Sequence, residues 1–413
     1  MRAVFVNHCH PDTPHVCAVR LREFANAMAA RGHRIVLLTA TLARNDDGDD
    51  PAALPAALGR HDWVRPFRLA CRPVPAAATE LLQAHRLPPP FGKAVALWCY
   101  AVKDGVFWNW TEGSRPFWDA LARDFQPDVV WATFGNVDGL NIARGIAAAS
   151  GCPWVIDVKD PWDAFVPGPI RASMARRYAD AAALTALSET HLAGAATHFA
   201  MPATVVYSGI GANQLDDARP VPQDDGIFRL VLTGSTYDAR DLALLADTLG
   251  DWLRRAGAGS GDRIEFVYAG GDHRRVADAV GRLDGSCQLR ILPQVDPTAL
   301  ATLQATASAN LYIKGRATPF HHKLVELLAA GRPIICYPAD TAEAQRIAAD
   351  VGGRLYSCAD RHALATAFDA VRAGAGRPIS LDRTALKRYT WAAQSARLED
   401  VLATAPCKRM GCK

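Results

Sequence analysis

One segment of the chain places a lysine and a glutamate where phosphorylated ligands usually bind. Residues 319–335 predict a loop, a short helix carrying Lys323 and Glu326, a helix stop at Gly331 and a buried strand. In this order the loop amides and both side chains come to the carboxyl edge of a parallel sheet. We therefore predict that Lys323 contacts phosphate and that Glu326 lies in the same site. A solvated lysine and a surface glutamate are the alternatives, although the apolar neighbours of Glu326 favour burial.

A second phosphate-binding element is expected earlier in the same half of the chain. Gly234 and Ser235 follow a predicted strand and precede a helix that begins near Asp241. Their amides and the Ser235 hydroxyl are therefore expected to meet a diphosphate at the start of a helix, and Gly234 lets the backbone approach closely. The alternative for Gly234 is a tight turn without ligand contact. Arg240 is a candidate second cation for the diphosphate.

The first half of the chain carries a separate group of polar residues after its first predicted strand. A loop at this end of a strand faces the ligand side of a parallel sheet, so acceptor contacts or general polar lining explain such residues. His10 and Arg20 are the predicted acceptor contacts. Zinc is the weaker interpretation because the spacing matches no closed structural site, and we predict no metal. The polar residues of this loop are His8, Cys9, His10, Asp12, His15 and Cys17.

Three carboxylates follow other strands or loops of the first half. Asp157 and Asp160 lie at the end of a predicted strand and just after it, where a carboxylate can orient an acceptor hydroxyl or act as a base. Asp157 is the predicted acceptor contact, with capping of the next turn as its alternative. Asp138 is a further predicted acceptor contact, and a helix N-cap is its alternative. Asp160, His10 and Lys323 are the predicted catalytic residues.

Alternating strands and helices in both halves must position these side chains. In the first half, a strand at 3–6, a helix ending at Gly32 and a strand at 35–39 predict a βαβ unit. The fold class is therefore α/β: two Rossmann-like, doubly wound domains with helices on both faces of each parallel sheet, facing each other across a cleft. Further strands are predicted at 128–132, 154–157, 184–187, 204–207, 228–233, 264–269, 289–292, 310–313 and 333–337.

The predicted domain boundaries follow the polar stretch between the halves. The N-terminal domain is predicted at 1–211 and the C-terminal domain at 226–384, with a last helical segment at 385–404 crossing back to the first domain. Residues 41–126 interrupt the alternation and predict an insertion rich in aromatic side chains. These aromatics are expected to pack the insertion onto its domain, with a platform for a sugar ring or a lipid-linked acceptor as the alternative.

Composition narrows the class of protein. The chain has 413 residues, of which 50% are apolar and 21% are charged, and its formal net charge of +4 does not suggest nucleic-acid binding. Its 10 cysteines are scattered, which predicts reduced thiols. The start shows no signal-peptide pattern, and no run of about 18 uncharged apolar residues occurs. We expect a cytoplasmic protein, at most peripheral to the inner face of a membrane.

Several motifs, in order along the chain, resemble the family-four glycosyltransferases, which have the two-domain GT-B fold. The resemblance implies transfer of a sugar from a nucleoside diphosphate sugar to an acceptor hydroxyl with retention, in bacterial-type glycan or glycoconjugate biosynthesis. It implies no cofactor or required metal, and a sugar, glycan or lipid-linked acceptor as the partner. The motifs lie at Arg20 through His33, 126–130, 157–162, 208–210, 233–237, 319–335 and 389–391.

The resemblance also assigns roles to single residues. The position of Glu326 binds the nucleotide ribose in this family, and the segment around Gln294 resembles the backbone that contacts the nucleobase. Thr318 departs from the pattern, because many members have a glutamate there that contacts the donor sugar. His322 or His321 is then expected to reach the sugar instead. A nucleotide-sugar epimerase of the same fold and a non-catalytic GT-B scaffold are the alternative functions.

Overall fold

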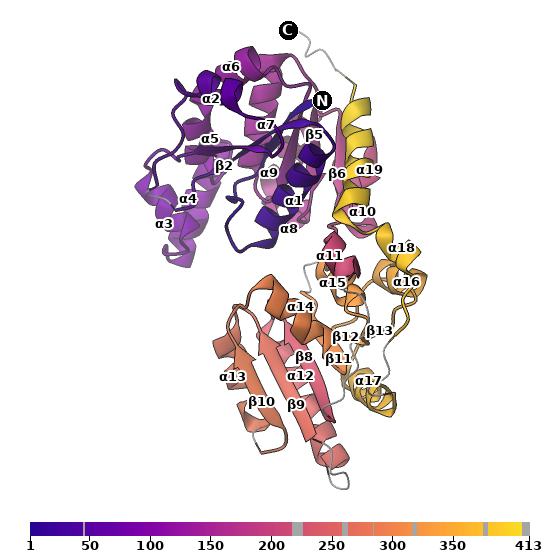
Figure 1. Ribbon diagram of the computed structural model, residues 1–413. Helices are drawn as coiled ribbons and strands as arrows, with labels where there is room; N and C mark the ends of the chain where they lie inside the picture. The colour runs from indigo at the N-terminus through magenta and orange to yellow at the C-terminus, as the bar shows by residue number, and fades with distance from the viewer. Residues whose placement is uncertain are drawn as a thin grey trace. The chain divides into compact units, whose positions relative to one another are not determined.

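The computed structural model describes residues 1–43, 46–216, 226–257, 263–283, 285–315, 320–374 and 379–406. The chain divides into two compact units, which are Met1–Ser208 with Trp391–Lys413, and Gly209–Thr390. Each unit is an α/β structure with a parallel sheet of its own (Figure 1). Thr318 and the basic tail from 407 onward lie outside the described residues.

The first unit contains a seven-stranded parallel sheet in the order β3-β2-β1-β4-β5-β6-β7. Val4 of β1 pairs with Val36 on one side and with Val130 on the other, so the winding direction changes between β1 and β4. This topology is doubly wound, as predicted. The strands are β1 (Arg2–Val6), β2 (Arg34–Ala40), β3 (Phe67–Cys71), β4 (Val129–Phe134), β5 (Trp154–Val158), β6 (Ala183–Ala186) and β7 (Ala203–Val205).

Successive side chains of β1 point to opposite faces of this sheet, and both faces are buried. Ala3 and Phe5 pack on one face with Phe24, and Val4 and Val6 pack on the other. Because successive strand residues point to opposite faces, a strand with apolar residues at every position needs helices on both sides. Outside residues 41–126, the helices of the first unit are α1 (Val16–Ala30), α7 (Val137–Ser150), α8 (Trp162–Phe165), α9 (Gly168–Arg177), α10 (Glu189–Ala196) and α19 (Trp391–Thr404).

The C-terminal helix α19 packs on α1 within the first unit. Leu398 and Leu402 join the apolar cluster that contains Phe24, and the Trp391 ring meets the Phe24 ring edge to face at 5.2 Å. Arg31 donates a hydrogen bond to Glu399 at 2.6 Å. The predicted segment 385–404 consists of two helices, because α18 (Arg383–Lys387) ends before α19 begins and belongs to the second unit.

The segment 41–126 is only partly an insertion. Its residues Phe67–Cys71 form the edge strand β3, which pairs in parallel with β2 and buries Leu69 and Cys71. This strand is short and partly polar, so its alternation was too weak to predict it. The other elements are α2 (Leu54–Arg60), α3 (Ala77–Gln83), α4 (Pro89–Val102), α5 (Trp108–Ser114), α6 (Trp118–Ala120), a 3₁₀ turn (Arg115–Phe117) and a π turn (Leu121–Phe125).

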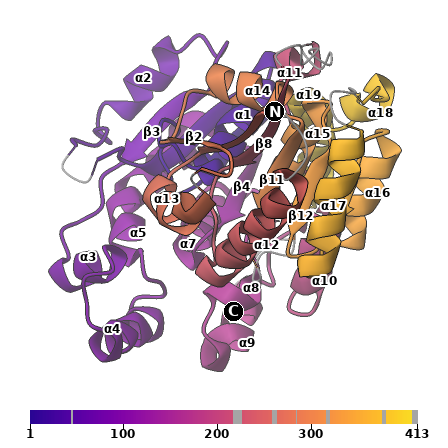
Figure 2. The ribbon, with the colours of Figure 1, turned by 90° about the horizontal axis from the view of Figure 1, so that it is seen from below.

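Aromatic residues of this segment differ in their burial, and several are half-buried. Trp110, Phe117 and Phe125 are buried in the core of the first unit, as the packing interpretation expects. Phe91 and Trp98 on α4 are exposed. Helices α3 and α4 lie side by side and project from the first unit (Figure 2).

The second unit contains a six-stranded parallel sheet in the order β10-β9-β8-β11-β12-β13. Leu230 and Leu232 of β8 face one apolar cluster, whereas Val231 faces another. The short edge strand β13 was not predicted. The strands are β8 (Ile227–Thr233), β9 (Arg263–Ala269), β10 (Gln288–Leu292), β11 (Ala309–Ile313), β12 (Ile334–Tyr337) and β13 (Leu355–Ser357).

Helices cover both faces of this sheet as well, which confirms the predicted fold class of the second half. Trp252 of α12 fills one face between the rings of Phe228 and Phe368 and donates to Asp369 at 2.7 Å. The helices are α11 (Ala212–Asp216), α12 (Ala239–Gly257), α13 (His273–Val280), a 3₁₀ turn (Gly281–Leu283), α14 (Pro297–Ala305), α15 (Lys323–Ala329), α16 (Ala342–Asp350), α17 (Arg361–Ala373) and α18. Within the described ranges, no helix is both long and apolar enough to cross a bilayer.

Candidate functional site

Lys323 and Gly234 meet at the carboxyl edge of the second unit's sheet. The Lys323 ammonium donates a hydrogen bond to the carbonyl oxygen of Thr233, the last residue of β8, at 2.7 Å. A Cβ atom on Gly234 would lie 2.5 Å from the same ammonium nitrogen. Gly234 also has a φ of +79°, which side chains rarely tolerate. The turn therefore favours glycine here, and a larger residue would also displace the Lys323 ammonium.

Three side chains that sequence reasoning missed hold the turn after β8. Tyr268 donates to the carbonyl of Gly234 at 2.7 Å, and its own oxygen accepts the Asp272 amide at 3.0 Å. Asp272 accepts hydrogen bonds from the amide and the hydroxyl of Thr236. The Gly234 amide donates to Ala269, so it serves the turn and is not available to a diphosphate, contrary to the prediction. Ser235, the next residue, is exposed.

Burial lowers the pKa of Lys323 to about 8, and the nearby carboxylate of Glu326 partly opposes this shift. The side chain is 8% exposed, and no carboxylate among the described residues lies within ion-pair distance of it. A buried ammonium held only by a carbonyl is incompletely compensated. An anion bound beside it would supply the missing charge.

Glu326 lies one helical turn after Lys323 on α15. Its carboxylate accepts a hydrogen bond from the side-chain amide of Gln304 at 3.1 Å. Burial raises its pKa, whereas the hydrogen bond from Gln304 and the charge of Lys323 lower it. Gln304 is itself buried, and its backbone carbonyl accepts a hydrogen bond from the side-chain amide of Asn310 at 3.1 Å. These contacts hold Gln304 in place beside Glu326.

His321 is packed inside the second unit, and His322 is half-buried. The His321 ring lies 5.5 Å from each of the Tyr237 and Tyr312 rings and 5.2 Å from the His322 ring. Neither of its ring nitrogens has a hydrogen-bond partner among the described residues. Burial lowers its pKa, and the charge of Lys323 acts in the same direction, so the ring is neutral.

The other two predicted donor-binding side chains are exposed. Arg240 lies in the first turn of α12, where its amide donates to Asp238 at 2.7 Å. Gln294 lies between β10 and α14. No hydrogen bond or ion pair joins either side chain to Lys323 in the part of the chain that the structure describes. Their predicted donor contacts are not tested by this geometry.

Arg20 and Asp157 form a fully buried ion pair in the first unit, which corrects their predicted role as acceptor contacts. Two guanidinium nitrogens donate to the two carboxylate oxygens at 2.8 and 3.1 Å, and neither side chain is exposed. Arg20 also donates to the carbonyl of Val206 and to Ser208, and Asp157 accepts from Thr185. These bonds occupy both side chains inside the core, so neither is offered to a ligand.

Asp138 is also buried, which corrects its prediction as an acceptor contact. Its carboxylate accepts the amide of Phe107 at 2.8 Å and the hydroxyl of Thr111 at 3.3 Å, which ties the loop before α5 to α7. The N-cap of α7 is Asn136, not Asp138. Burial raises the pKa of Asp138 to about 7, and its hydrogen bonds from Phe107 and Thr111 limit the rise.

A cluster of titratable side chains occupies the carboxyl edge of the first unit's sheet. Asp160 forms an ion pair with Lys159 at 2.8 Å, and burial raises the pKa of Asp160 although the charge of Lys159 lowers it. The sulfur atoms of Cys9 and Cys17 lie close together, and their interaction lowers the pKa of Cys17 and raises that of Cys9. The same cluster includes His15, whose pKa is raised by a hydrogen bond to Cys17. Lys159 was not predicted as a site residue.

His10 lies in the same loop and is half-buried. Its ring nitrogen is 3.8 Å from the Asp12 carboxylate and accepts the Asp12 amide at 3.2 Å. Burial lowers its pKa, while the charge of Asp12 opposes this shift. His10 and Asp160 therefore remain accessible in part, in contrast to the buried carboxylates at 138 and 157.

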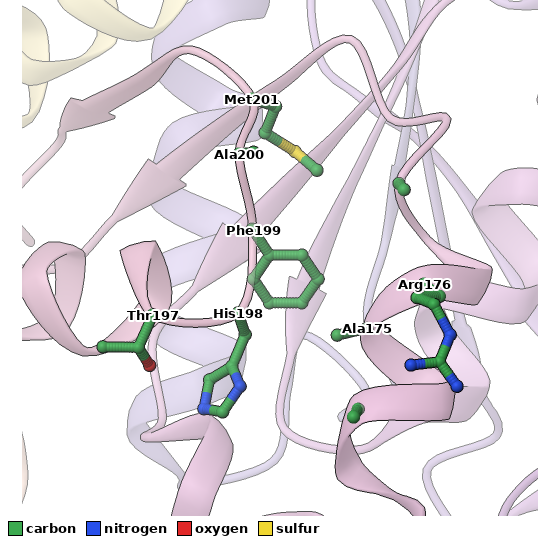
Figure 3. A pocket seen from close by; sticks show the side chains of 9 residues that line it. Ala175, Arg176, Thr197, His198, Phe199, Ala200 and Met201 are labelled. Atoms are coloured by element: carbon green, nitrogen blue, oxygen red, sulfur yellow. The ribbon is translucent and has the colours of Figure 1, made fainter.

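A separate pocket of about 380 Å³ lies between α9 and the segment after α10 (Figure 3). Arg176 lines one side and His198 another, with the Phe199 ring between them. None of the predicted site residues lines this pocket, so it has no part in the predicted chemistry.

The sequence matches no protein-family model, and no curated protein matches it. Solved structures do match its fold. The structure of HepE from Anabaena in complex with UDP-glucose is 15% identical, covers 98% of this chain and 100% of that chain, and has a TM-score of 0.60. The UDP-forming α,α-trehalose-phosphate synthase from Burkholderia xenovorans is 11% identical over 98% of this chain and 99% of that chain, with a TM-score of 0.63.

A structure of the trehalose-6-phosphate synthase OtsA gives a TM-score of 0.65 at 12% identity, with 98% of this chain and 99% of that chain covered. Identities this low show the fold and leave the reaction open. The chain therefore has the GT-B fold of these glycosyltransferases.

The buried pair in the first unit predicts a specific mutational pattern. Replacing Arg20 by Met should lower the free energy of unfolding by about 3–5 kcal/mol, because Asp157 is left buried without its counter-charge. Asp157→Leu should have a similar effect, and the double variant should lose less than the sum of the two. Chemical denaturation monitored by circular dichroism measures all three.

The exposed pair of Arg72 and Asp47 provides the matched control. Arg72→Met should change stability much less than Arg20→Met, because exposed pairs contribute little. Additive losses in the double variant would contradict a coupled buried pair.

Proposed function

We propose that the protein is a retaining glycosyltransferase that moves a sugar from a nucleoside diphosphate sugar, with uridine as the base, to an acceptor hydroxyl. The observation that carries this proposal is the incompletely compensated Lys323 ammonium beside the Gly234 turn. The fold supports it, because HepE with the same fold is seen in complex with UDP-glucose. The UDP-forming α,α-trehalose-phosphate synthase, which has the same fold, supports a UDP-linked donor as well.

Lys323 supplies the positive charge for the donor diphosphate in this proposal. A diphosphate bound at the exposed Ser235 would accept hydrogen bonds from the ammonium, which already points at the carboxyl end of β8. Charge on the departing diphosphate grows as the glycosidic bond breaks, so a fixed cation stabilises the transition state more than the ground state. This role requires neither a cofactor nor a metal ion.

Glu326 is proposed to bind the ribose of the donor. An ionised carboxylate can accept hydrogen bonds from two neighbouring hydroxyl groups, and Gln304 holds one oxygen of Glu326 in place. Burial raises the pKa of Glu326, but the nearby Lys323 favours the ionised carboxylate when its ammonium is charged. His322 is proposed as a contact to the donor sugar.

For the acceptor, His10 and Asp160 remain as candidates in the first unit. Asp160 is half-buried and pairs with Lys159, and a carboxylate of raised pKa can orient an acceptor hydroxyl or take its proton. The buried carboxylates at 138 and 157 have no such part in the proposal. The acceptor class is a sugar, a glycan or a lipid-linked sugar.

Nucleotide binding tests this proposal directly. UDP should raise the thermal unfolding temperature of the wild type with increasing concentration, because it binds the native state. Lys323→Ala should weaken UDP binding by roughly 10- to 150-fold, the effect of losing about 1.5–3 kcal/mol of charge-assisted hydrogen bonding. The control is Lys387→Ala, which removes an exposed lysine of the same unit and should leave UDP binding unchanged.

Product analysis then separates transfer from its alternatives. Mass spectrometry of UDP-glucose incubated with a panel of sugar and sugar-phosphate acceptors should show a glycosylated product, with the donor anomer retained by NMR. Isomerised UDP-sugar in the absence of acceptor would indicate an epimerase. UDP binding without any product would indicate a non-catalytic scaffold.

The pKa of Lys323 predicts a pH dependence of UDP binding. Below pH 8 the ammonium is charged in the free protein, and the diphosphate meets a cation. Above that pH the free protein loses the proton that the complex needs, so affinity should fall by up to about tenfold per pH unit. Calorimetry of UDP binding between pH 6.5 and 10 measures the trend. Lys323→Met should bind weakly and lack this fall, and an unchanged fall in that variant would assign it to another group.

We further propose that the protein acts in glycan biosynthesis in the cytoplasm and makes peripheral contact with an anionic membrane. Helix α4 supports this contact, because it exposes Phe91, Leu97, Trp98 and Val102. Residues 84–103 carry Arg86, Lys93 and Lys103 and no acidic residue. Exposed apolar and aromatic side chains beside cationic ones favour the interface of an anionic bilayer.

Vesicle co-sedimentation tests the membrane contact. The wild type should bind vesicles that contain anionic phospholipid more tightly than zwitterionic vesicles. Phe91→Ser combined with Trp98→Ser should weaken binding at least about tenfold, since inserting one large apolar side chain contributes about 1.5–3 kcal/mol. Val64→Ser removes an apolar side chain elsewhere that is even more exposed, and it should have no effect. Equal binding of the double variant would contradict the contact.

A further inference from the structure

Three metal-ligating side chains converge in the first unit, in the loop between β1 and α1. The sulfur atoms of Cys9 and Cys17 and a ring nitrogen of His15 all lie within 4.8 Å of one another. No other group of three or more such side chains at this spacing occurs among the residues that the structure describes. The cluster is therefore a specific feature of this loop.

The fold builds this cluster without help from a ligand. Cys9 follows β1, His15 is the N-cap of α1, and Cys17 is the second residue of α1. The side chain of Asn7 connects both ends of the loop, because it accepts the Cys9 amide at 3.3 Å and donates to the Cys17 carbonyl at 3.0 Å. These bonds keep the two cysteines close together.

Access to the cluster is graded. Cys17 is 7% exposed, whereas Cys9 is half-exposed and His15 is exposed. An ion could therefore enter from the solvent side, past His15 and Cys9. One ligand at the bottom and two at the rim form a partly open site.

The donor set selects the class of ion. Two thiolates and an imidazole are ligands of Zn²⁺, and soft sulfur ligands disfavour Mg²⁺ and Ca²⁺. Two thiolates balance the charge of a divalent ion. The nearby Lys159 is a further cation beside Cys17, and Asp160 offsets its charge by pairing with it at 2.8 Å.

We propose that Cys9, His15 and Cys17 bind one Zn²⁺ ion and leave one coordination position open to water or to an oxygen ligand. Three protein ligands with an open position are typical of zinc sites that take part in binding or catalysis, whereas structural sites use four. The site is independent of Lys323 and of the proposed donor binding, so it goes beyond the proposed transfer reaction.

Zinc binding would replace one hydrogen bond that the loop makes. The His15 Nδ1 atom accepts the Cys17 amide at 3.2 Å. Coordination through Nδ1 would occupy this acceptor, and coordination through Nε2 would place a proton on Nδ1. In both cases the helix cap is exchanged for a metal bond.

Zinc titration of the full chain tests the site. Protein reduced under anaerobic conditions and stripped with a chelator should bind one Zn²⁺ per chain, measured by competition with a chromophoric chelator and by elemental analysis. Co²⁺ in place of Zn²⁺ should give a thiolate-to-cobalt charge-transfer absorption. Cys9→Ser should weaken Zn²⁺ binding at least about 100-fold, since loss of a ligand exceeds the about 10- to 100-fold effect of losing a ligand's outer partner.

Two further variants make the result decisive. His15→Ala removes an exposed ligand and should weaken Zn²⁺ binding while circular dichroism shows an intact fold. Because Cys17 is buried, replacing it could prevent folding, and His15→Ala tests the site without that risk. The control Cys287→Ser removes a half-exposed cysteine of the second unit and should bind Zn²⁺ as the wild type does. UDP binding should be the same with and without Zn²⁺.

Two results would overturn the proposal. The first is reduced protein that binds no Zn²⁺. In that case, a Cys9–Cys17 disulfide found by mass spectrometry after treatment with a peroxide would identify the two cysteines as a redox pair. The second is Zn²⁺ binding that persists after Cys9→Ser and His15→Ala are combined.

Discussion

The burial of the Lys323 ammonium against the carboxyl end of β8 is the constraint on which the candidate donor site depends. The positive φ of Gly234 favours glycine at this position, and a Cβ atom there would lie 2.5 Å from the Lys323 ammonium nitrogen, so the lysine would have to move. The turn after β8 must then be held by other groups, and Tyr268 and Asp272 do this from the end of β9 and the following loop. Tyr268, Asp272 and the Lys323 ammonium thus hold the turn together.

The buried cations Arg20 in the first unit and Lys323 in the second differ in how far their charge is compensated. Arg20 meets a carboxylate with two parallel hydrogen bonds and has no unmet charge, so its role is structural. Lys323 meets a backbone carbonyl, and its lowered pKa shows that burial outweighs the attraction of Glu326. A protein that retains such an uncompensated cation loses stability, and an anionic ligand is the group that offsets this loss.

The first unit's candidate chemistry lies instead in the loop after β1 and the residues after β5. These segments follow strands β1 and β5, which both border β4 in the sheet, so their polar side chains gather at one edge. Cys9 and Cys17 come from this loop, and Lys159 and Asp160 follow β5. The cluster combines sulfur, imidazole, ammonium and carboxylate groups, a richer set than acceptor recognition requires.

Hydrophobic periodicity was sufficient to predict the doubly wound fold and eleven of the thirteen strands within a few residues, because strands buried on both faces leave long apolar runs. It missed β3 and β13, which are edge strands of five and three residues. Strand order also predicted that Lys323 and Gly234 share one sheet edge. Side-chain partners were beyond such reasoning, because pairing depends on distances between segments far apart in the chain. Arg20 and Asp157 are separated by 137 residues, and only the folded structure made them an ion pair and removed them from the site.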